Sequence, residues 1–217
     1  MQLEGSADWR ASGIEIGPMG WAEGVRDARS PHYDRRPSGI EIDTVVLHNI
    51  SLPPLTFGSN CVEDFFCGRL DCRQHEALAS LEGIRVSSHF FIRRNGEMVQ
   101  FVSCNDRAWH AGLSSLLGRR RCNDFSIGIE IEGTDFCPFE ERQYQSLEGL
   151  LRAISHRYPV RYIVAHSDIA PTRKTDPGPY FDWGRLMREK ACFGSPEFPG
   201  AAARIQKSLL EPSSVIG

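Results

Sequence analysis

The strongest constraint on the fold is a pair of apolar segments on either side of Asn95-Gly96. Residues 88–93 have the sequence SHFFIR and residues 97–102 have the sequence EMVQFV, and both compositions are typical of β-strands. An Asn-Gly pair suits a type I′ turn, because both central residues of that turn need a positive φ angle. The sequence therefore predicts an antiparallel β-hairpin closed by a type I′ turn.

Three further segments predict strands that carry or lead into polar residues. A β-branched run at 43–48 ends in His48, and a run at 161–165 leads into His166. Residues 126–132, with the sequence SIGIEIE, put three isoleucines on one strand face and the glycine and two glutamates on the other. These polar side chains are candidates for a functional site.

A helix is predicted between residues 140 and 157, where apolar side chains recur at helical spacing and Pro159 follows. A short helix is also expected at 21–28. Strands and helices interleave along the chain, and we find no internal repeat. We therefore expect an α/β fold with one central mixed β-sheet flanked by helices.

The length of 217 residues predicts a single domain with extended ends. Both ends of the chain contain scattered glycine, proline and charged residues without sustained periodicity. We expect an N-terminal arm at 1–20, a domain at 21–190 and a C-terminal extension at 191–217.

Charge and hydropathy exclude some classes of partner. The formal net charge is −3, whereas phosphate binding requires a positive excess on one face. No run approaches the roughly 20 apolar residues that a membrane-spanning helix needs. We therefore expect neither nucleic acid nor a membrane as a partner, and we expect a monomer.

The cysteines bear on the compartment. There are seven, an odd number, without a CxxC pair or the spacing of a disulfide framework. Free thiols in a reducing compartment, and hence a cytoplasmic location, are the simplest interpretation. The first ten residues, MQLEGSADWR, lack the basic start and apolar stretch of a secretory signal. Structural disulfides in a periplasmic protein remain the alternative.

His48, His166 and Asp176 are candidate metal ligands. The two histidines follow predicted strands, and Asp176 lies in a loop at 170–179 whose prolines restrict the backbone. Two neutral imidazoles and one carboxylate leave a tetrahedral zinc ion with one open position, as in catalytic zinc sites. Each residue also has a simpler interpretation, since such histidines are often only hydrogen-bonded and an aspartate before Pro-Gly often forms a turn.

Six segments in a fixed order make the metal site a stronger prediction. They are VLHNIS at 46–51, RVSSH at 85–89, AWHAG at 108–112, RCNDFSIGIEIEG at 121–133, HSDIAP at 166–171 and RKTDPG at 173–178. This series resembles the type-2 N-acetylmuramoyl-L-alanine amidases, whose fold also occurs in peptidoglycan-recognition modules. The closest resemblance is to the cytoplasmic AmpD-type branch, which acts on 1,6-anhydro-muropeptides in cell-wall recycling.

The resemblance implies a role for five residues of the expected site. It places the zinc ligands at His48, His166 and Asp176, the catalytic acid/base at Glu130, and a lysine that stabilises the negative oxygen of the intermediate at Lys174. Zinc lowers the pKa of a bound water and polarises the carbonyl, and a nearby carboxylate can transfer the proton to the leaving nitrogen. The implied reaction is hydrolysis of the amide between the muramyl lactyl group and L-alanine.

The resemblance also implies substrate contacts. Arg85 and Arg121 match arginines that hold the carboxylates of the muropeptide, and a guanidinium binds a carboxylate through two parallel hydrogen bonds. Asn49, Trp109 and His110 lie in matching segments. For Trp109 the alternative is a place in the core, and for His110 the alternative is support of the metal site.

Other interpretations of Glu130 and Lys174 stay open from the sequence. Glu130 could simply face solvent, and Glu132 shares its strand face and competes for the acid/base role, although it could instead pair with an arginine. Lys174 lies two residues before Asp176, so in an extended loop both side chains point to one side. Without that neighbour it would be interpreted as a solvated loop lysine.

A muropeptide-binding module without catalysis is the main alternative function, because the same fold supports binding and hydrolysis. A binder could lose a metal ligand or the acid/base without losing affinity. All five residues of the implied catalytic set are present here, which favours a hydrolase.

Overall fold

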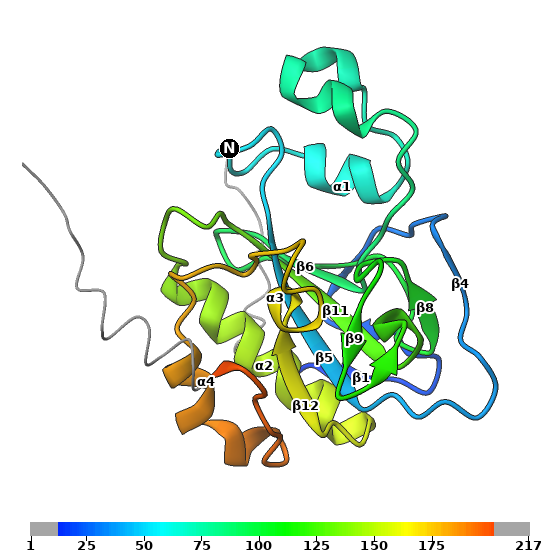
Figure 1. The fold of residues 1–217 in the computed structure, drawn as a ribbon, viewed down its shortest axis with the longest axis vertical. Coiled ribbons are helices and arrows are strands. Elements are labelled where there is room, and N and C mark those ends of the chain that lie inside the picture. Colours follow the sequence, from blue (N-terminus) through cyan, green and yellow to red (C-terminus); the bar gives the residue numbers. More distant parts are fainter. Residues whose placement is uncertain (1–12, 202–217) are drawn as a thin grey trace, which may run out of the picture.

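The structure is a computed structural model that describes residues 13–201 (Figure 1). The predicted arm and extension therefore lie partly outside the described residues, at 1–12 and 202–217. The boundaries of these two segments remain predictions.

A six-stranded mixed sheet forms the centre of the molecule, as the sequence predicted. Its strand order is β12-β5-β11-β6-β7-β3, in which only the β6–β7 pair is antiparallel. The strands are β12 (Tyr162–Ala165), β5 (Thr44–Ile50), β11 (Ser126–Glu132), β6 (Phe90–Ile92), β7 (Met98–Gln100) and β3 (Arg26–Asp27).

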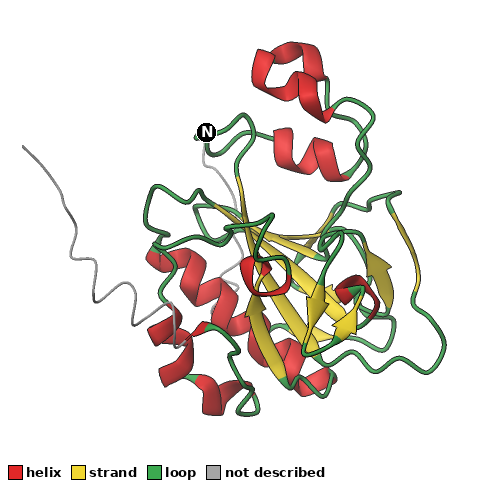
Figure 2. Cartoon of the chain, in the orientation of Figure 1, coloured by secondary structure: helices red, strands yellow, loops and turns green. Residues whose placement is uncertain are grey.

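Short elements surround this sheet (Figure 2). The two-stranded pairs are β1 (Glu15–Ile16) with β2 (Ala22–Glu23), β4 (Tyr33–Arg35) with β8 (Asp106–Ala108), and β9 (Ser115–Leu116) with β10 (Arg119–Arg120). The helices are α1 (Cys61–Phe66), α2 (Glu141–Arg157), α3 (His166–Ile169) and α4 (Trp183–Arg188), and the 3-10 turns are η1 (Cys72–Gln74), η2 (Glu76–Leu81), η3 (Cys122–Asp124) and η4 (Lys190–Phe193).

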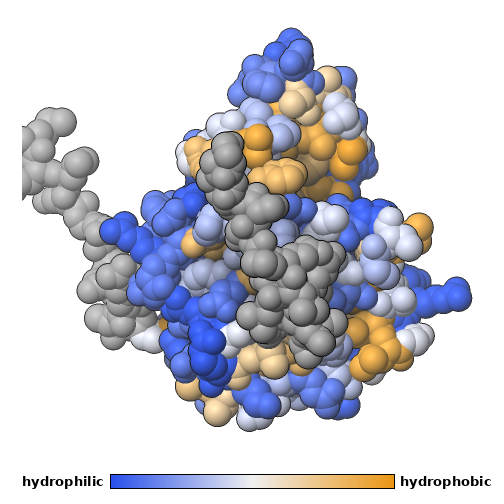
Figure 3. Space-filling view, turned by 60° about the vertical axis from the view of Figure 1, so that its left-hand side comes forward, coloured by the Kyte–Doolittle hydropathy of each residue, from blue (hydrophilic) through white to orange (hydrophobic). Residues whose placement is uncertain are grey.

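Two layers cover the two faces of the sheet. On one face, Val45 and Leu47 of β5 and the three isoleucines of β11 pack in one core cluster with α2 and α4. On the other face, Val46 packs with residues of β9, η3 and α3, while α1 packs on β6 and β7. Figure 1 shows α2 and α4 on one side and the α1–η2 lobe projecting from the molecule. In Figure 3 the tip of this lobe is hydrophilic, with hydrophobic side chains gathered below it.

Helix α2 begins and ends as its sequence predicts. The Glu140 N–H donates to Oε1 of Gln143 at 3.0 Å, one half of a capping box. Its apolar side chains, Tyr144, Leu147, Leu151 and Ile154, are buried against the sheet. The helix ends at Arg157, two residues before a proline.

The hairpin is present, but the predicted turn type is wrong. Strands β6 and β7 pair in the register Phe91↔Val99. Within the turn, only Gly96 has a positive φ, 86°, whereas a type I′ turn would need one at Asn95 as well. The Arg93 N–H donates to Glu97 O and the Gly96 N–H donates to Arg93 O, so the connection has three residues instead of two. The extra residue explains the difference.

The prediction of a helix at 21–28 is also wrong. This segment contains β2 and β3, with Gly24 between them at φ 78°. The Ala22 N–H donates to the side chain of Gln100, and β3 pairs in parallel with β7. These long-range pairings were not visible in the local sequence.

No helix among residues 13–201 is long and apolar enough to cross a membrane. All seven cysteines lie within the described residues and all are free, as expected.

Candidate metal centre

Parallel pairing brings the two predicted histidine ligands together. Strands β5 and β12 are neighbours, with Leu47 opposite Ala165, so the next residues, His48 and His166, also lie side by side. His166 is the first residue of α3. Asp176 comes from the loop after α3, and its carbonyl accepts a hydrogen bond from the Ser167 N–H, which ties the loop to the start of that helix.

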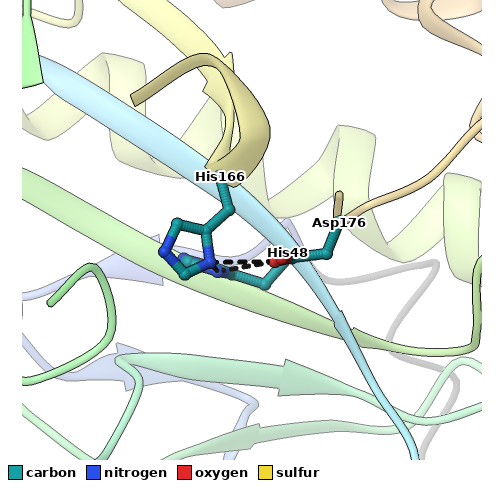
Figure 4. A group of neighbouring side chains, drawn as sticks. All are labelled: His48, His166 and Asp176. Atoms are coloured by element: carbon teal, nitrogen blue, oxygen red, sulfur yellow. Dashed lines mark hydrogen bonds and ion pairs between the residues drawn. The ribbon is translucent and has the colours of Figure 1, made fainter. Parts of the chain in front are cut away.

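Three ligand atoms converge in this centre (Figure 4). Nδ1 of His48 lies 2.9 Å from Nδ1 of His166 and 3.1 Å from Oδ2 of Asp176. Nδ1 of His166 lies 3.0 Å from the same Asp176 oxygen. Ligand atoms about 2.0–2.1 Å from a tetrahedral zinc ion would lie about 3.3 Å apart. The three ligand atoms would therefore need to move apart only slightly to hold a small divalent cation.

Hydrogen bonds behind the rings orient their lone pairs toward the centre. Nε2 of His166 lies 3.2 Å from the Ala111 carbonyl, which can only accept, so the proton is on Nε2 and Nδ1 is left as an acceptor. Nε2 of His48 lies 3.0 Å from Nδ1 of His110, whose Nε2 is 3.2 Å from the Ser126 hydroxyl. These partners can hold both ligand rings in the tautomer that a metal requires.

The charges of the centre also suit a cation. Burial opposes ionisation of Asp176, but its close contacts with His166 and His48 outweigh burial and hold the pKa of this carboxyl below its usual range. Burial, followed by the neighbouring His166, lowers the pKa of His48 to about 4, so its imidazole is neutral at pH 7. Neutral imidazoles and an ionised carboxylate are the protonation states of metal ligands.

Glu130 lies directly across the strand pairing from His48. The two residues are in register between β11 and β5, and Oε1 of Glu130 is 4.0 Å from Nδ1 of His48. Its side chain is buried, not solvent-facing, and Oε2 has no hydrogen-bond partner among the described residues. Burial and then the charge of Asp176 raise its pKa well above the usual value, with Lys174 acting in the opposite direction.

Glu132 has a different environment. Its carboxylate accepts hydrogen bonds from the backbone N–H groups of Gly58 and Arg94. It therefore supports two loops, and in these contacts it pairs with backbone groups and not with an arginine side chain. Lys174 lines a cavity of about 440 Å³ together with Asp176 and Asn49, so the loop carries both side chains to the same opening.

His110 and Asn49 make contacts within the protein. The ring of His110 lies against the backbone of β11, where a Cβ at Gly128 would come within 2.5 Å of it. The Asn49 side-chain amide donates to Asp135 at 2.7 Å and to the Pro177 carbonyl at 3.1 Å, which joins two loops beside the centre.

The three remaining predicted substrate residues lie on other segments. Arg85 is exposed and lines a cavity of about 510 Å³ together with residues of the α1–η2 lobe. Trp109 follows β8 and is partly buried. Arg121 has φ 62° and a side chain that is 69% exposed, with Nε 3.3 Å from Asp124.

Two hydrogen-bond partners of the predicted residues were missed by sequence reasoning. Asp34 accepts a hydrogen bond from Nε1 of Trp109, and Asp135 accepts one from Asn49. The sequence HYDRR at 32–36 has no alternation of polar and apolar residues, so it gave no signal for the first. No local pattern marked the second.

Comparison with known proteins decides the family. The family model of N-acetylmuramoyl-L-alanine amidases matches residues 38–179, which include all five residues of the implied catalytic set. The chain belongs to this amidase family.

Relatives within the family include well-matched chains. The 1,6-anhydro-N-acetylmuramyl-L-alanine amidase AmpD of Escherichia coli is 51% identical over 170 residues, 77% of this chain and 93% of the relative. A crystal structure of a selenomethionine derivative of AmpD has a TM-score of 0.76 and 48% identity, covering 78% of this chain and 96% of that one. The E. coli amidase AmiD, in complex with anhydro-N-acetylmuramic acid-L-Ala-D-γ-Glu-L-Lys, has a TM-score of 0.53 and 32% identity, covering 93% and 73%.

Proposed function

We propose that this amidase hydrolyses the amide bond between the lactyl group of 1,6-anhydro-N-acetylmuramic acid and L-alanine in muropeptides, and that it depends on zinc. The names of the AmpD relatives and their identity over most of both chains support the substrate. The observation that carries the mechanism is the convergence of His48, His166 and Asp176 on one point beside Glu130.

Each residue of the catalytic set has a defined task in this proposal. Zinc held by the three ligands would lower the pKa of a water and polarise the scissile carbonyl. Glu130 takes a proton from the attacking water and returns it to the leaving nitrogen. Lys174 places a positive charge where the carbonyl oxygen becomes negative, a contribution typically worth about 3 kcal/mol at such sites.

Five further residues are proposed to bind substrate. Arg85 and Arg121 are exposed guanidinium groups suited to the carboxylates of the peptide. Trp109, His110 and Asn49 contribute by direct contact or by fixing neighbouring side chains. The proposal includes a cytoplasmic monomer with a role in peptidoglycan recycling.

Activity with and without a chelator tests the function. Purified protein is incubated with anhydro-N-acetylmuramyl tripeptide, and released peptide is followed by chromatography and mass spectrometry. We expect peptide release that a chelator abolishes and added zinc restores. Tight binding of the muropeptide without product would favour the non-catalytic module.

Metal content of variants tests the ligand set. His48→Ala and Asp176→Ala should each lose bound zinc and activity, because three ligands are needed to hold the ion with an open position. His156→Ala, which changes an exposed histidine of α2, should keep both. Full zinc content in either ligand variant would refute the site.

A further inference from the structure

Along strand β4 and its flanking residues, partly buried and exposed side chains alternate. His32, Asp34 and Arg36 are partly buried, whereas Tyr33 and Arg35 between them are exposed. Because side chains of a strand alternate between its faces, the three share one face. β4 pairs antiparallel with β8, with Asp34 opposite Arg107 (Figure 1). This segment precedes residue 38, where the match to the family model begins.

Asp34 joins two side chains at the centre of this face. Its Oδ1 accepts a hydrogen bond from Nε1 of Trp109 at 3.1 Å and another from Nε of Arg107 at 2.7 Å. Its Oδ2 pairs with the second nitrogen of the same guanidinium. The Arg107 hydrogen bond, followed by that from Trp109, outweighs burial and lowers the pKa of Asp34, so the carboxylate is ionised.

Arg107 extends the contact to a second predicted substrate residue. Its Nη1 donates to Oδ1 of Asp124 at 2.5 Å, and Oδ2 of Asp124 lies 3.3 Å from Nε of Arg121. Trp109 and Arg121 are therefore connected through Asp34, Arg107 and Asp124.

His32 fixes the other side of Trp109. The two rings stack with their centroids 6.2 Å apart and an angle of 14° between their planes. The Ser87 hydroxyl donates to the His32 carbonyl and accepts from the Trp109 N–H. Arg36 anchors the end of the segment by donating to the carbonyls of Cys104 and Ser126.

We propose that Asp34 is a positioning residue for binding of the peptide part of the substrate, and that it orients Trp109 directly and Arg121 through Arg107 and Asp124. The inference rests on the proposed function, in which Trp109 and Arg121 contact the muropeptide. The Asp34 side chain is 44% exposed and that of Arg107 is 18% exposed, so Asp34 lies at the solvent edge of this set of contacts.

Steady-state kinetics of Asp34→Asn and Asp34→Ala test this role. With the tripeptide substrate we expect KM to rise about tenfold or more, the scale of one charge-assisted hydrogen bond, while kcat changes little. With anhydro-N-acetylmuramyl-L-alanine, which lacks the later carboxylates of the peptide, the variants should resemble the wild type. Asp34→Glu should recover part of the KM.

Controls separate this role from a structural one. Asp27, on β3, is an exposed ion-pair partner of Arg29 and lies at the opposite edge of the sheet from β12. Asp27→Asn should change neither KM nor kcat. The melting temperature of Asp34→Asn should stay close to that of the wild type. An unchanged KM for the tripeptide, beside normal wild-type activity, would overturn this inference alone. A wild type that neither cleaves nor binds the muropeptide would overturn the proposed function and the inference with it.

Discussion

Glu130 illustrates how much one side chain owes to its surroundings. Its carboxyl group is buried, one of its oxygens lacks a hydrogen-bond partner among the described residues, and burial raises its pKa. An unpartnered buried oxygen is unfavourable for folding, so its retention beside the ligand set is consistent with a catalytic use. A divalent cation nearby would favour the ionised form and lower the pKa again.

Glu130→Gln should separate catalysis from metal binding. The amide keeps the shape of the side chain but cannot accept and return a proton, so we expect turnover to fall by about 10² to 10⁴. Zinc content should stay at the wild-type level, because Glu130 is not one of the three converging residues. Glu23→Gln, at an exposed position of β2, serves as the control. Wild-type turnover in Glu130→Gln would exclude the acid/base role.

At the residue scale, the sequence identified side chains better than their contacts. The alternation in β11 correctly separated Glu130 from the isoleucines, because strand periodicity is a local property. The hydrogen bonds of Glu132, Asn49 and Asp34 join segments far apart in the chain. Such partners depend on the assembled fold, which no local pattern encodes.

At the element scale, Gln143 connects α2 to the sheet. Its Nε2 donates to the carbonyl of Glu132 at 2.9 Å and to that of Ile92 at 3.3 Å, at the ends of β11 and β6. Its Oε1 accepts from the N–H of Glu140. One buried side chain thus completes the capping box and satisfies two strand ends.

Gln143→Ala should destabilise the protein by about 2–4 kcal/mol, because it leaves buried backbone groups without partners and removes part of the helix cap. Gln145→Ala provides a matched control, since Gln145 makes only an exposed hydrogen bond to Glu141 among the described contacts. Gln145→Ala should lower the free energy of unfolding by less than about 0.5 kcal/mol. Chemical denaturation measures both values. Equal effects of the two changes would argue against the connecting role of Gln143.

Helices and strands set by local sequence were predicted correctly, whereas those set by contacts between distant segments were not. Helix α2 and strands β5, β11 and β12 have strong local periodicity or composition, and all were predicted. The turn type at Gly96 was predicted wrongly, because the connection has three residues instead of two. A helix was wrongly predicted at 21–28, where pairing with β7 forms a strand instead. Tertiary pairing overrides local preference in such segments.

At the scale of the whole molecule, the candidate metal centre joins distant parts of the chain. His48 and His166 are separated by 118 residues, and His48 and Asp176 by 128. The unfolded chain does not present these three ligands together, so an ion bound by them stabilises the folded state through mass action.

Zinc should therefore raise the melting temperature of the metal-free protein. At a free concentration 100 times the dissociation constant, the stabilisation is about 2.7 kcal/mol, which corresponds to roughly 5–10 °C for a chain of this length. Differential scanning calorimetry with a chelator and with zinc measures the shift. His48→Ala should lose it and His156→Ala should keep it. An equal shift in His48→Ala would mean that zinc binds elsewhere.

The chain assigns its two tasks to different kinds of segment. Glu130 and His48, the proposed acid/base and a proposed metal ligand, lie in paired strands, where an insertion of one residue would turn a side chain to the opposite face. Arg85, Trp109 and Arg121, the proposed substrate residues, lie on the connections at 51–89 and 101–125, outside the strands of the central sheet. Substitutions confined to these connections would therefore change the substrate specificity and leave Glu130 and His48 in register.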